Sequence, residues 1–158
     1  MTNEALQNKI EKWFQDPEAA GLAFSEEESQ FLNVSIDPKY LYELMSKLKS
    51  DPDTSLDYLF CLSGVDWGED LGVVYHLEST LHRHQLVVKV RTPNRDQPTL
   101  ATVSSIWQTA EFHEREVFDF FGIIFSDHPN LKRLFLTDEW QGYPMRKDYE
   151  DEINMILK

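Results

Sequence analysis

Three apolar segments in the middle of the chain, each separated from the next by a short turn, constrain the fold most strongly. They span 57–65, 71–79 and 84–92 and are rich in Val, Leu, Phe and Tyr. The first two flank a turn-forming cluster at 66–70, and only 80–83 separates the second from the third. Links this short join antiparallel neighbours. The sequence therefore predicts an antiparallel meander of three strands.

Two amphipathic helices are predicted on the N-terminal side of these strands. The first spans 3–15, where the apolar side chains share one helical face. Asp37-Pro38 places a capping residue before a proline at the first position of the second helix, whose face predicted to be buried holds Leu41, Leu44, Met45 and Leu48. Alternating apolar and polar residues predict a short strand over 31–37, between the two helices.

Two further helices are predicted after the strands, a short one over 99–107 and a longer one over 109–121 that ends at Gly122. Glycine suits a helix C-terminus because it adopts positive φ without steric cost. The element order α-β-α-β-β-β-α is typical of the α+β class. We therefore predict a single α+β domain over 1–125, with an antiparallel sheet of three to four strands and helices packed on one face. An extended C-terminal tail over 126–158 follows.

Composition excludes several classes of function. The formal net charge of −13 disfavours a general nucleic-acid binder, because an acidic surface repels phosphates. The chain has no apolar run of about 18 residues, and residues 1–4 lack the basic start of a secretory signal, so we expect a soluble cytoplasmic protein. A single cysteine, Cys61, cannot supply the four thiolates of an iron–sulfur cluster.

The segment 126–149 differs from the rest of the chain. Its basic residues balance its acidic residues, and it is rich in aromatic side chains and interrupted by prolines. It cannot bury all its apolar side chains against itself, so it either folds back over the sheet or lies on another protein. Aromatic residues together with arginine are typical of interface cores. From this composition we expect the segment to be disordered in the isolated chain.

The C-terminal third carries charged and aromatic residues with fixed gaps. The first part of this motif is Glu114-Arg115-Glu116, Asp119, Phe120-Phe121, His128 and Lys132-Arg133-Leu134, and the second part is Gly142, Pro144 and Arg146-Lys147-Asp148-Tyr149. The pattern over 107–149 resembles the C component of bacterial NADH:quinone oxidoreductase, which is the 30 kDa subunit family of respiratory complex I. It departs slightly at Phe112-His113, where members often have Trp-Tyr, and at Met145, where they often have Leu.

The resemblance implies a scaffold subunit with no catalytic residue of its own. Such subunits lie in the peripheral arm, on the cytoplasmic side of the inner membrane, and dock onto the quinone-site subunit (the D component) near the cluster-bearing subunits. The complex passes electrons from NADH to quinone and translocates protons or sodium ions. Other subunits bind the flavin, the iron–sulfur clusters and the quinone, so the resemblance implies no cofactor and no metal in this chain.

Three further expectations concern the chain as a whole. We expect no nucleic-acid partner, and association with the membrane only through the complex. Because the chain ends at Lys158, soon after the motif, we also expect a separate C component rather than one fused to the D component.

The resemblance assigns the motif residues to docking between subunits. By position, these are Glu114, Arg115, Glu116, Asp119, His128, Arg133, Trp140, Arg146, Lys147, Asp148 and Tyr149. One interpretation is that the charges pair with partner carboxylates or cations, and the other is that they pair within the chain and brace the tail. Helical spacing also predicts a ladder of ion pairs along one helix face, through Glu111, Arg115 and Asp119.

Other classes of function have weaker support in the sequence. His82 and His84, with His76 on a neighbouring strand, could serve a free-standing metal-binding protein, but their spacing matches no metal motif. Glu114 and Asp119 do not suit a hydrolase, because carboxylates five residues apart on a helix diverge. Related ferredoxin-dependent oxidoreductases and membrane-bound hydrogenases contain a subunit similar to this one, so the sequence leaves the electron donor open.

Overall fold

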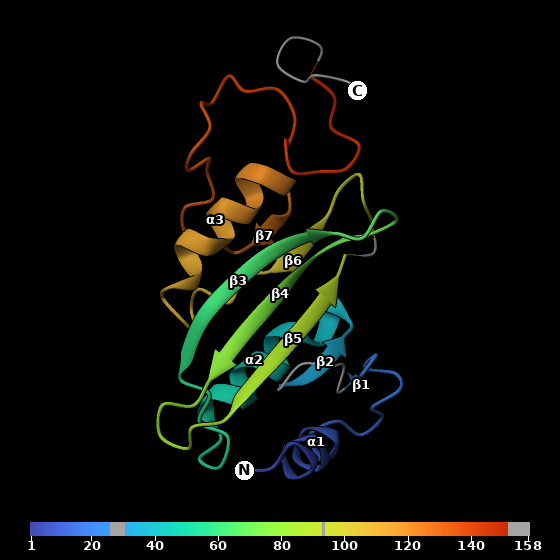
Figure 1. The fold of residues 1–158 in the computed structure, drawn as a ribbon, viewed down its shortest axis with the longest axis vertical. Coiled ribbons are helices and arrows are strands. Elements are labelled where there is room, and N and C mark those ends of the chain that lie inside the picture. Colours follow the sequence, from blue (N-terminus) through green and yellow to red (C-terminus); the bar gives the residue numbers. More distant parts are fainter. Residues whose placement is uncertain (26–30, 93, 152–158) are drawn as a thin grey trace.

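The computed structural model describes residues 1–25, 31–92 and 94–151 and shows a mixed α+β domain. Its elements are α1 (Asn3–Lys12), β1 (Ala23–Ser25), β2 (Leu32–Ile36), the 3-10 helix η1 (Pro38–Tyr40), α2 (Leu41–Ser50), β3 (Tyr58–Asp66), β4 (Leu71–Glu78), β5 (Gln85–Arg91), β6 (Thr99–Ala101), α3 (Ala110–Phe121) and β7 (Ile124–Ser126). Figure 1 shows how they are arranged. The predicted α+β class is confirmed.

Within the described residues, the main sheet has five strands in the order β1-β2-β5-β4-β3. The predicted meander is confirmed, since β3 pairs antiparallel with β4 and β4 pairs antiparallel with β5. The sheet is nevertheless larger than the three to four strands predicted and is not wholly antiparallel, because β2 pairs in parallel with β5. Local patterns predict β2 as a strand, but they do not show that it joins the sheet beside β5. The three-residue β1 gives almost no local signal.

One face of the sheet carries the core. In β4, Leu71, Val73, Tyr75 and Leu77 are buried, while Val74 and His76 on the opposite face are only half-buried. The core face is covered by apolar side chains from helices α1, α2 and α3, namely Leu6 and Ile10 of α1, Leu41, Leu44, Met45 and Leu48 of α2, and Ala110, Val117 and Phe121 of α3. Helices packed on one face, as predicted, follow from this alternation.

The short helix predicted over 99–107 does not form. Residues 99–101 are instead strand β6, which pairs in parallel with β7 in a small second sheet. Turns follow, in which the amides of Ile106 and Trp107 both donate to the carbonyl of Val103. The apolar spacing of this stretch fits a helix, but β7 supplies backbone hydrogen-bond partners that the local sequence does not reveal.

Helix α3 ends where predicted, at Gly122, which has φ 71°. Its amide donates to the carbonyl of Phe118, and a Cβ at this position would lie only 2.4 Å from the ring of Tyr143. The chain beyond β7 forms loops that wind around this end of α3, and the described part up to residue 151 contains no further helix or strand (Figure 1). The remainder of the predicted tail, 152–158, lies outside the described residues.

A substitution at Gly122 tests how closely the C-terminal loops pack on α3. Gly122→Ala should lower the free energy of unfolding by about 1–2 kcal/mol, because alanine is strained at positive φ. The clash between its Cβ and the ring of Tyr143 should lower it by a further ~1–3 kcal/mol. The matched control is the same substitution made in a Tyr143→Ala chain, where φ at 122 is unchanged but the ring that a Cβ would meet is gone. Urea denaturation measures the loss in each chain, and equal losses of stability would contradict the packing.

Candidate functional site

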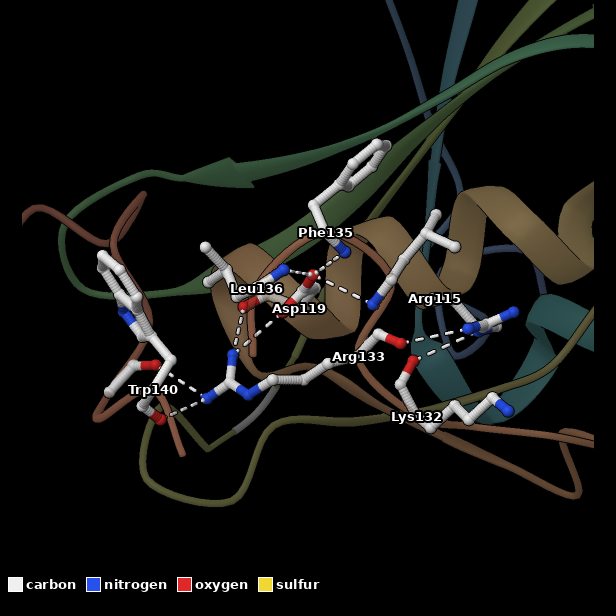
Figure 2. A network of polar contacts seen from close by, with 9 residues as sticks. Arg115, Asp119, Lys132, Arg133, Phe135, Leu136 and Trp140 are labelled. Atoms are coloured by element: carbon white, nitrogen blue, oxygen red, sulfur yellow. Dashed lines mark hydrogen bonds and ion pairs between the residues drawn. The ribbon is translucent and has the colours of Figure 1, made fainter. Parts of the chain in front are cut away.

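The carboxylate of Asp119, on the last turn of α3, organises the loops that follow the domain. Its side chain is fully buried. One oxygen, Oδ2, accepts hydrogen bonds from the amides of Leu134, Phe135 and Leu136 at 3.0, 2.7 and 3.0 Å (Figure 2). The other oxygen accepts from Arg133 Nη1 at 3.0 Å. A single carboxylate therefore fixes a turn of backbone that has no helix or strand partner of its own.

The electrostatics of Asp119 match this role. Burial on its own raises the pKa of a carboxyl group, but the three amide donors and the Arg133 guanidinium more than offset burial and lower the pKa of Asp119 below its usual value. The charged form is therefore the form that the fold stabilises. Hydrogen bonds to a charged acceptor are stronger than those between neutral groups.

Arg133 extends this network to the next loop. Besides Asp119, its guanidinium donates to the carbonyls of Trp140 at 3.1 Å and Gly142 at 3.0 Å and lies over the ring of Tyr143. Figure 2 shows the guanidinium between the Asp119 carboxylate and the loop at Trp140. The arginine fork thus ties the turn at 134–136 to the loop at 140–143 within one chain.

Arg115 performs a similar task one turn earlier on α3. Its Nε and Nη2 donate to the carbonyls of Lys132 and Arg133, at 3.2 and 3.0 Å. The predicted ladder through Glu111, Arg115 and Asp119 does not form among the described residues. Arg115 and Asp119 bond instead to backbone groups of the loop at 132–136. Helical spacing brought these side chains within reach, but unpaired backbone groups nearby are stronger competitors than exposed ion pairs.

Glu114 of α3 lies beside His128, and both side chains are fully buried. Glu114 accepts hydrogen bonds from the Thr102 hydroxyl and, at 2.7 Å, from the amide of Val103. His128 Nε2 lies 3.7 Å from the carboxylate and donates to the carbonyl of Glu111, while Nδ1 accepts from the amide of Asn130. Burial raises the pKa of Glu114 to about 7, although the two hydrogen bonds lower it.

A second polar network, which the sequence did not predict, attaches residues 147 and 148 of the C-terminal loops to the sheet. Asp66, at the end of β3, forms a bidentate pair with Arg95, with both N···O distances 2.8 Å. The same carboxylate accepts from the amides of Gly68 and Lys147, and Arg95 also contacts Asp148 at 2.8 Å. Arg95 and these amides hold the pKa of Asp66 well below its usual range. Asp66 and Arg95 are 29 residues apart, and no local pattern connects them.

The second part of the motif lies against the carboxyl end of α3. Arg146 Nε donates to the carbonyl of Phe121 at 2.6 Å, and the amide of Met145 donates to the carbonyl of Phe120 at 3.1 Å. Both carbonyls belong to the last turn of the helix, where no intrahelical donor is available. The motif therefore supplies the C-terminal cap of α3 from a distant part of the chain.

The side chains of the remaining predicted site residues form none of the hydrogen bonds and ion pairs described above. Glu116 is exposed on α3. The backbone carbonyl of Trp140 is used by Arg133, while its indole nitrogen is buried and has no partner among the described residues. The ring of Tyr149 lies beside Gly142, and the side chain of Lys147 points into solvent, so only its amide takes part.

Apolar side chains that these contacts hold in place remain exposed. The ring of Phe135 stacks on Phe120 with centroids 5.7 Å apart, yet 65% of Phe135 is exposed. Met145 is 57% exposed and lines a pocket of about 140 Å³ between α3 and β3, together with Leu62, Val117, Phe120 and Phe121. We call Phe120, Phe135 and Met145 the apolar patch. Exposed clusters of this kind mark interaction surfaces.

The histidines considered for metal binding lie elsewhere. The rings of His82 and His84 stack with centroids 6.0 Å apart, and His82 Nε2 lies 2.8 Å from the carbonyl oxygen of Pro52. The described ranges contain no group of three or more His, Cys, Asp or Glu residues that could hold a metal ion. The structure therefore adds no support for a metal site there.

The family model of the respiratory-chain NADH dehydrogenase 30 kDa subunit matches residues 34–153. The chain belongs to this family. The match includes the helix α3, the loops that follow it and the whole charged motif. None of the helices in the described ranges is both long and apolar enough to cross a membrane.

Curated relatives of this family member are components of NADH-quinone oxidoreductase. The C/D polypeptide of this enzyme from Phocaeicola vulgatus is 52% identical over 124 residues, which cover 78% of this chain and 24% of the relative. The C component from Chloroherpeton thalassium is 46% identical over 105 residues, which cover 65% of this chain and 43% of the relative. The chain thus spans about a quarter to two fifths of these proteins, and the expectation of an unfused C component remains a prediction.

Solved structures show the same fold. The trypsin-resistant fragment of Nqo5 superposes with a TM-score of 0.67 at 29% identity, covering 80% of this chain and 98% of the fragment. A chain of an archaeal membrane-bound sulfane sulfur reductase superposes with a TM-score of 0.74 at 24% identity, covering 93% of this chain and 85% of that chain. The latter likeness concerns the fold alone.

Removing the Asp119 carboxylate should destabilise the protein strongly. Asp119→Ala leaves three amides without their acceptor and Arg133 without its charged partner, so the free energy of unfolding should fall by about 3–5 kcal/mol. Glu116→Ala, on the exposed side of the same helix, should change it by less than about 0.5 kcal/mol. Urea denaturation compares the two variants, and similar small losses in both would contradict the assigned role.

The buried Glu114 predicts an unusual pH dependence. Its folded pKa of about 7 lies above its ordinary value of 4.5, so the folded state binds a proton more tightly. The free energy of unfolding therefore falls as pH rises from 4.5 to 7, by up to about 3 kcal/mol from this group.

Glu114→Gln keeps the shape of the side chain and removes its titration. The stability of the natural chain should drop relative to this variant between pH 4.5 and about 7. Denaturation series at several pH values measure this difference, and a difference that does not change with pH would show that Glu114 titrates normally.

Proposed function

We propose that this chain is a scaffold subunit in the peripheral arm of a proton- or sodium-translocating NADH:quinone oxidoreductase. It docks onto the quinone-site subunit, the D component, on the cytoplasmic side of the membrane, near the cluster-bearing subunits. It supplies no catalytic residue and holds no flavin, cluster, metal or quinone. Its contact with the membrane is made through the complex.

The observation that carries this proposal is the way the family motif is used. Asp119, Arg133 and Arg115 direct their polar atoms to backbone groups of 132–142. These residues shape a surface and leave no arrangement of nucleophile, base and oxyanion donors open to a substrate among the described residues. A family motif that shapes loops is consistent with recognition by another protein.

The apolar patch supplies the surface that such a partner covers. Phe135 and Met145 extend from loops that the motif holds in place. An exposed ring and thioether on ordered backbone lose little conformational entropy on binding, so their burial contributes to affinity. The relatives named C/D carry both components in one polypeptide, which favours the D component as the partner.

The second candidate is the equivalent subunit of a related ferredoxin-dependent oxidoreductase or membrane-bound hydrogenase, which the resemblance of the motif leaves open. The fold does not separate the two, since it also occurs in another respiratory membrane complex, the archaeal sulfane sulfur reductase. This alternative differs from the first in the electron-input subunits and not in the role of this chain. Identifying the co-purified subunits distinguishes the two complexes.

Purification of the tagged chain from its host membranes in mild detergent tests the proposal. We expect mass spectrometry to find the quinone-site subunit, the cluster subunits and the membrane subunits. Co-purified NADH-oxidising subunits would identify NADH as the electron donor. Phe135→Asp places a charge in the apolar patch and should reduce recovery of these partners about tenfold or more, because each 1.4 kcal/mol of lost affinity is tenfold.

Leu81→Asp is the matched control, because Leu81 is 70% exposed in the turn between β4 and β5, at the other end of the sheet. It should leave recovery unchanged. If the natural chain is recovered without partners, or if Phe135→Asp assembles as well as Leu81→Asp, the proposed docking surface is wrong.

A further inference from the structure

Arg146 differs from the other motif arginines in how its guanidinium is used. Only Nε is bonded, to the carbonyl of Phe121, and neither Nη1 nor Nη2 has a hydrogen-bond acceptor among the described residues. The guanidinium lies over the ring of Tyr143 at 4.8 Å. One edge is therefore anchored and one face is covered, while the two-nitrogen fork remains available.

The other arginines near this site have acceptors on their forks. Arg133 donates from both terminal nitrogens, and Arg115 from Nε and Nη2. Arg95 donates from all three of its nitrogens, to Asp66 and Asp148. Among these four, Arg146 alone has a fork without a bonded acceptor in the part of the chain that the structure describes.

The surroundings of Arg146 form a pocket of about 360 Å³ at the surface, made by the loop 141–150. Tyr143 and Tyr149 line it with Gln141, whose side-chain amide donates to the carbonyl of Glu139. Two acidic residues also line it. Asp148 has both oxygens engaged by Arg95, which offsets its charge, and Glu150 is exposed.

We propose that this pocket receives a carboxylate side chain of the neighbouring subunit, bound bidentately by the Arg146 fork. The inference rests on the proposed function, because it requires a docked protein partner. A planar fork that is already anchored through Nε and stacked on Tyr143 loses little freedom when it binds a planar carboxylate. Burial in the loop lowers the pKa of Arg146, and a bound anion would compensate for the lost hydration.

The pocket at Arg146 lies next to the apolar patch in the chain, because Met145, a member of the patch, directly precedes Arg146. A single partner surface can therefore cover Phe135 and Met145 and place an acidic side chain at Arg146. Desolvated charge pairs surrounded by apolar contacts are the arrangement in which an ion pair contributes most to specificity.

Phenylglyoxal labelling tests the assignment, because this reagent modifies guanidinium groups with accessible forks. The isolated chain and the complex purified through its tag are labelled in parallel, and the modified arginines are located by mass spectrometry. We expect Arg146 to react in the isolated chain faster than Arg133, and to be protected about tenfold or more in the complex. Arg83, whose side chain is 75% exposed, should react in the isolated chain and serves as its reactive reference.

Substitution gives the second measurement. Arg146→Lys keeps the charge but removes the fork, and it should reduce recovery of the partner subunits about tenfold or more. Arg83→Lys makes the same chemical change at the far end of the sheet and should not. Urea denaturation of the isolated Arg146→Lys chain verifies that the fold is retained, and recovery of partners by Arg146→Lys at the natural level would overturn the assignment.

The outcomes separate this inference from the proposed function. If the complex forms but Arg146 remains reactive in it, the partner carboxylate is wrong and the scaffold role stands. If added acetate slows phenylglyoxal modification of Arg146 in the isolated chain, but assembly into the complex does not, the pocket binds small anions and the inference is overturned. If the natural chain recovers no partner subunits, both proposals fail together.

Discussion

The hydrogen bonds from three consecutive amides to one oxygen of Asp119 determine the shape of the C-terminal third of the chain. A loop without helix or strand must satisfy its backbone donors with side chains or water. Asp119 does so from the last turn of α3, which is itself held on the sheet by Phe121 against Gly64. The sheet therefore positions the helix, the helix positions the carboxylate, and the carboxylate positions the loop.

The charged residues of the family motif therefore fix the loops that form the proposed docking surface. Arg133 joins the Asp119 turn to the loop at 140–142, and Asp66 with Arg95 holds the end at Lys147 and Asp148. Between these attachments, Phe135 and Met145 are exposed and Arg146 lines the surface pocket. A buried charge that loses its partner is costly, so these pairs disfavour loop arrangements in which Asp119 and Arg133 separate.

Much of the fold could be predicted from the sequence, because its signals are local. The meander follows from two short turns between apolar segments, and the end of α3 follows from Gly122. The parallel pairing of β2 with β5 and the strand β6 could not be predicted, since both depend on partners distant in the chain. The motif identified the family and most residues of the site, but not which charges pair within the chain. That division depends on the backbone of 132–142 and on Asp66 and Arg95, whose pairing has no local signal.

Composition favoured disorder of 126–149 in the isolated chain, whereas the observed hydrogen bonds favour a segment that the chain orders by itself. Hydrogen exchange of the isolated chain decides between these two expectations. The account predicts slow exchange at the amides of Leu134, Phe135 and Leu136, which donate to Asp119, and at the amide of Lys147, which donates to Asp66. Exchange of these four amides at the rate of an unstructured chain would contradict it, and would mean that a partner, not the motif, shapes the docking surface.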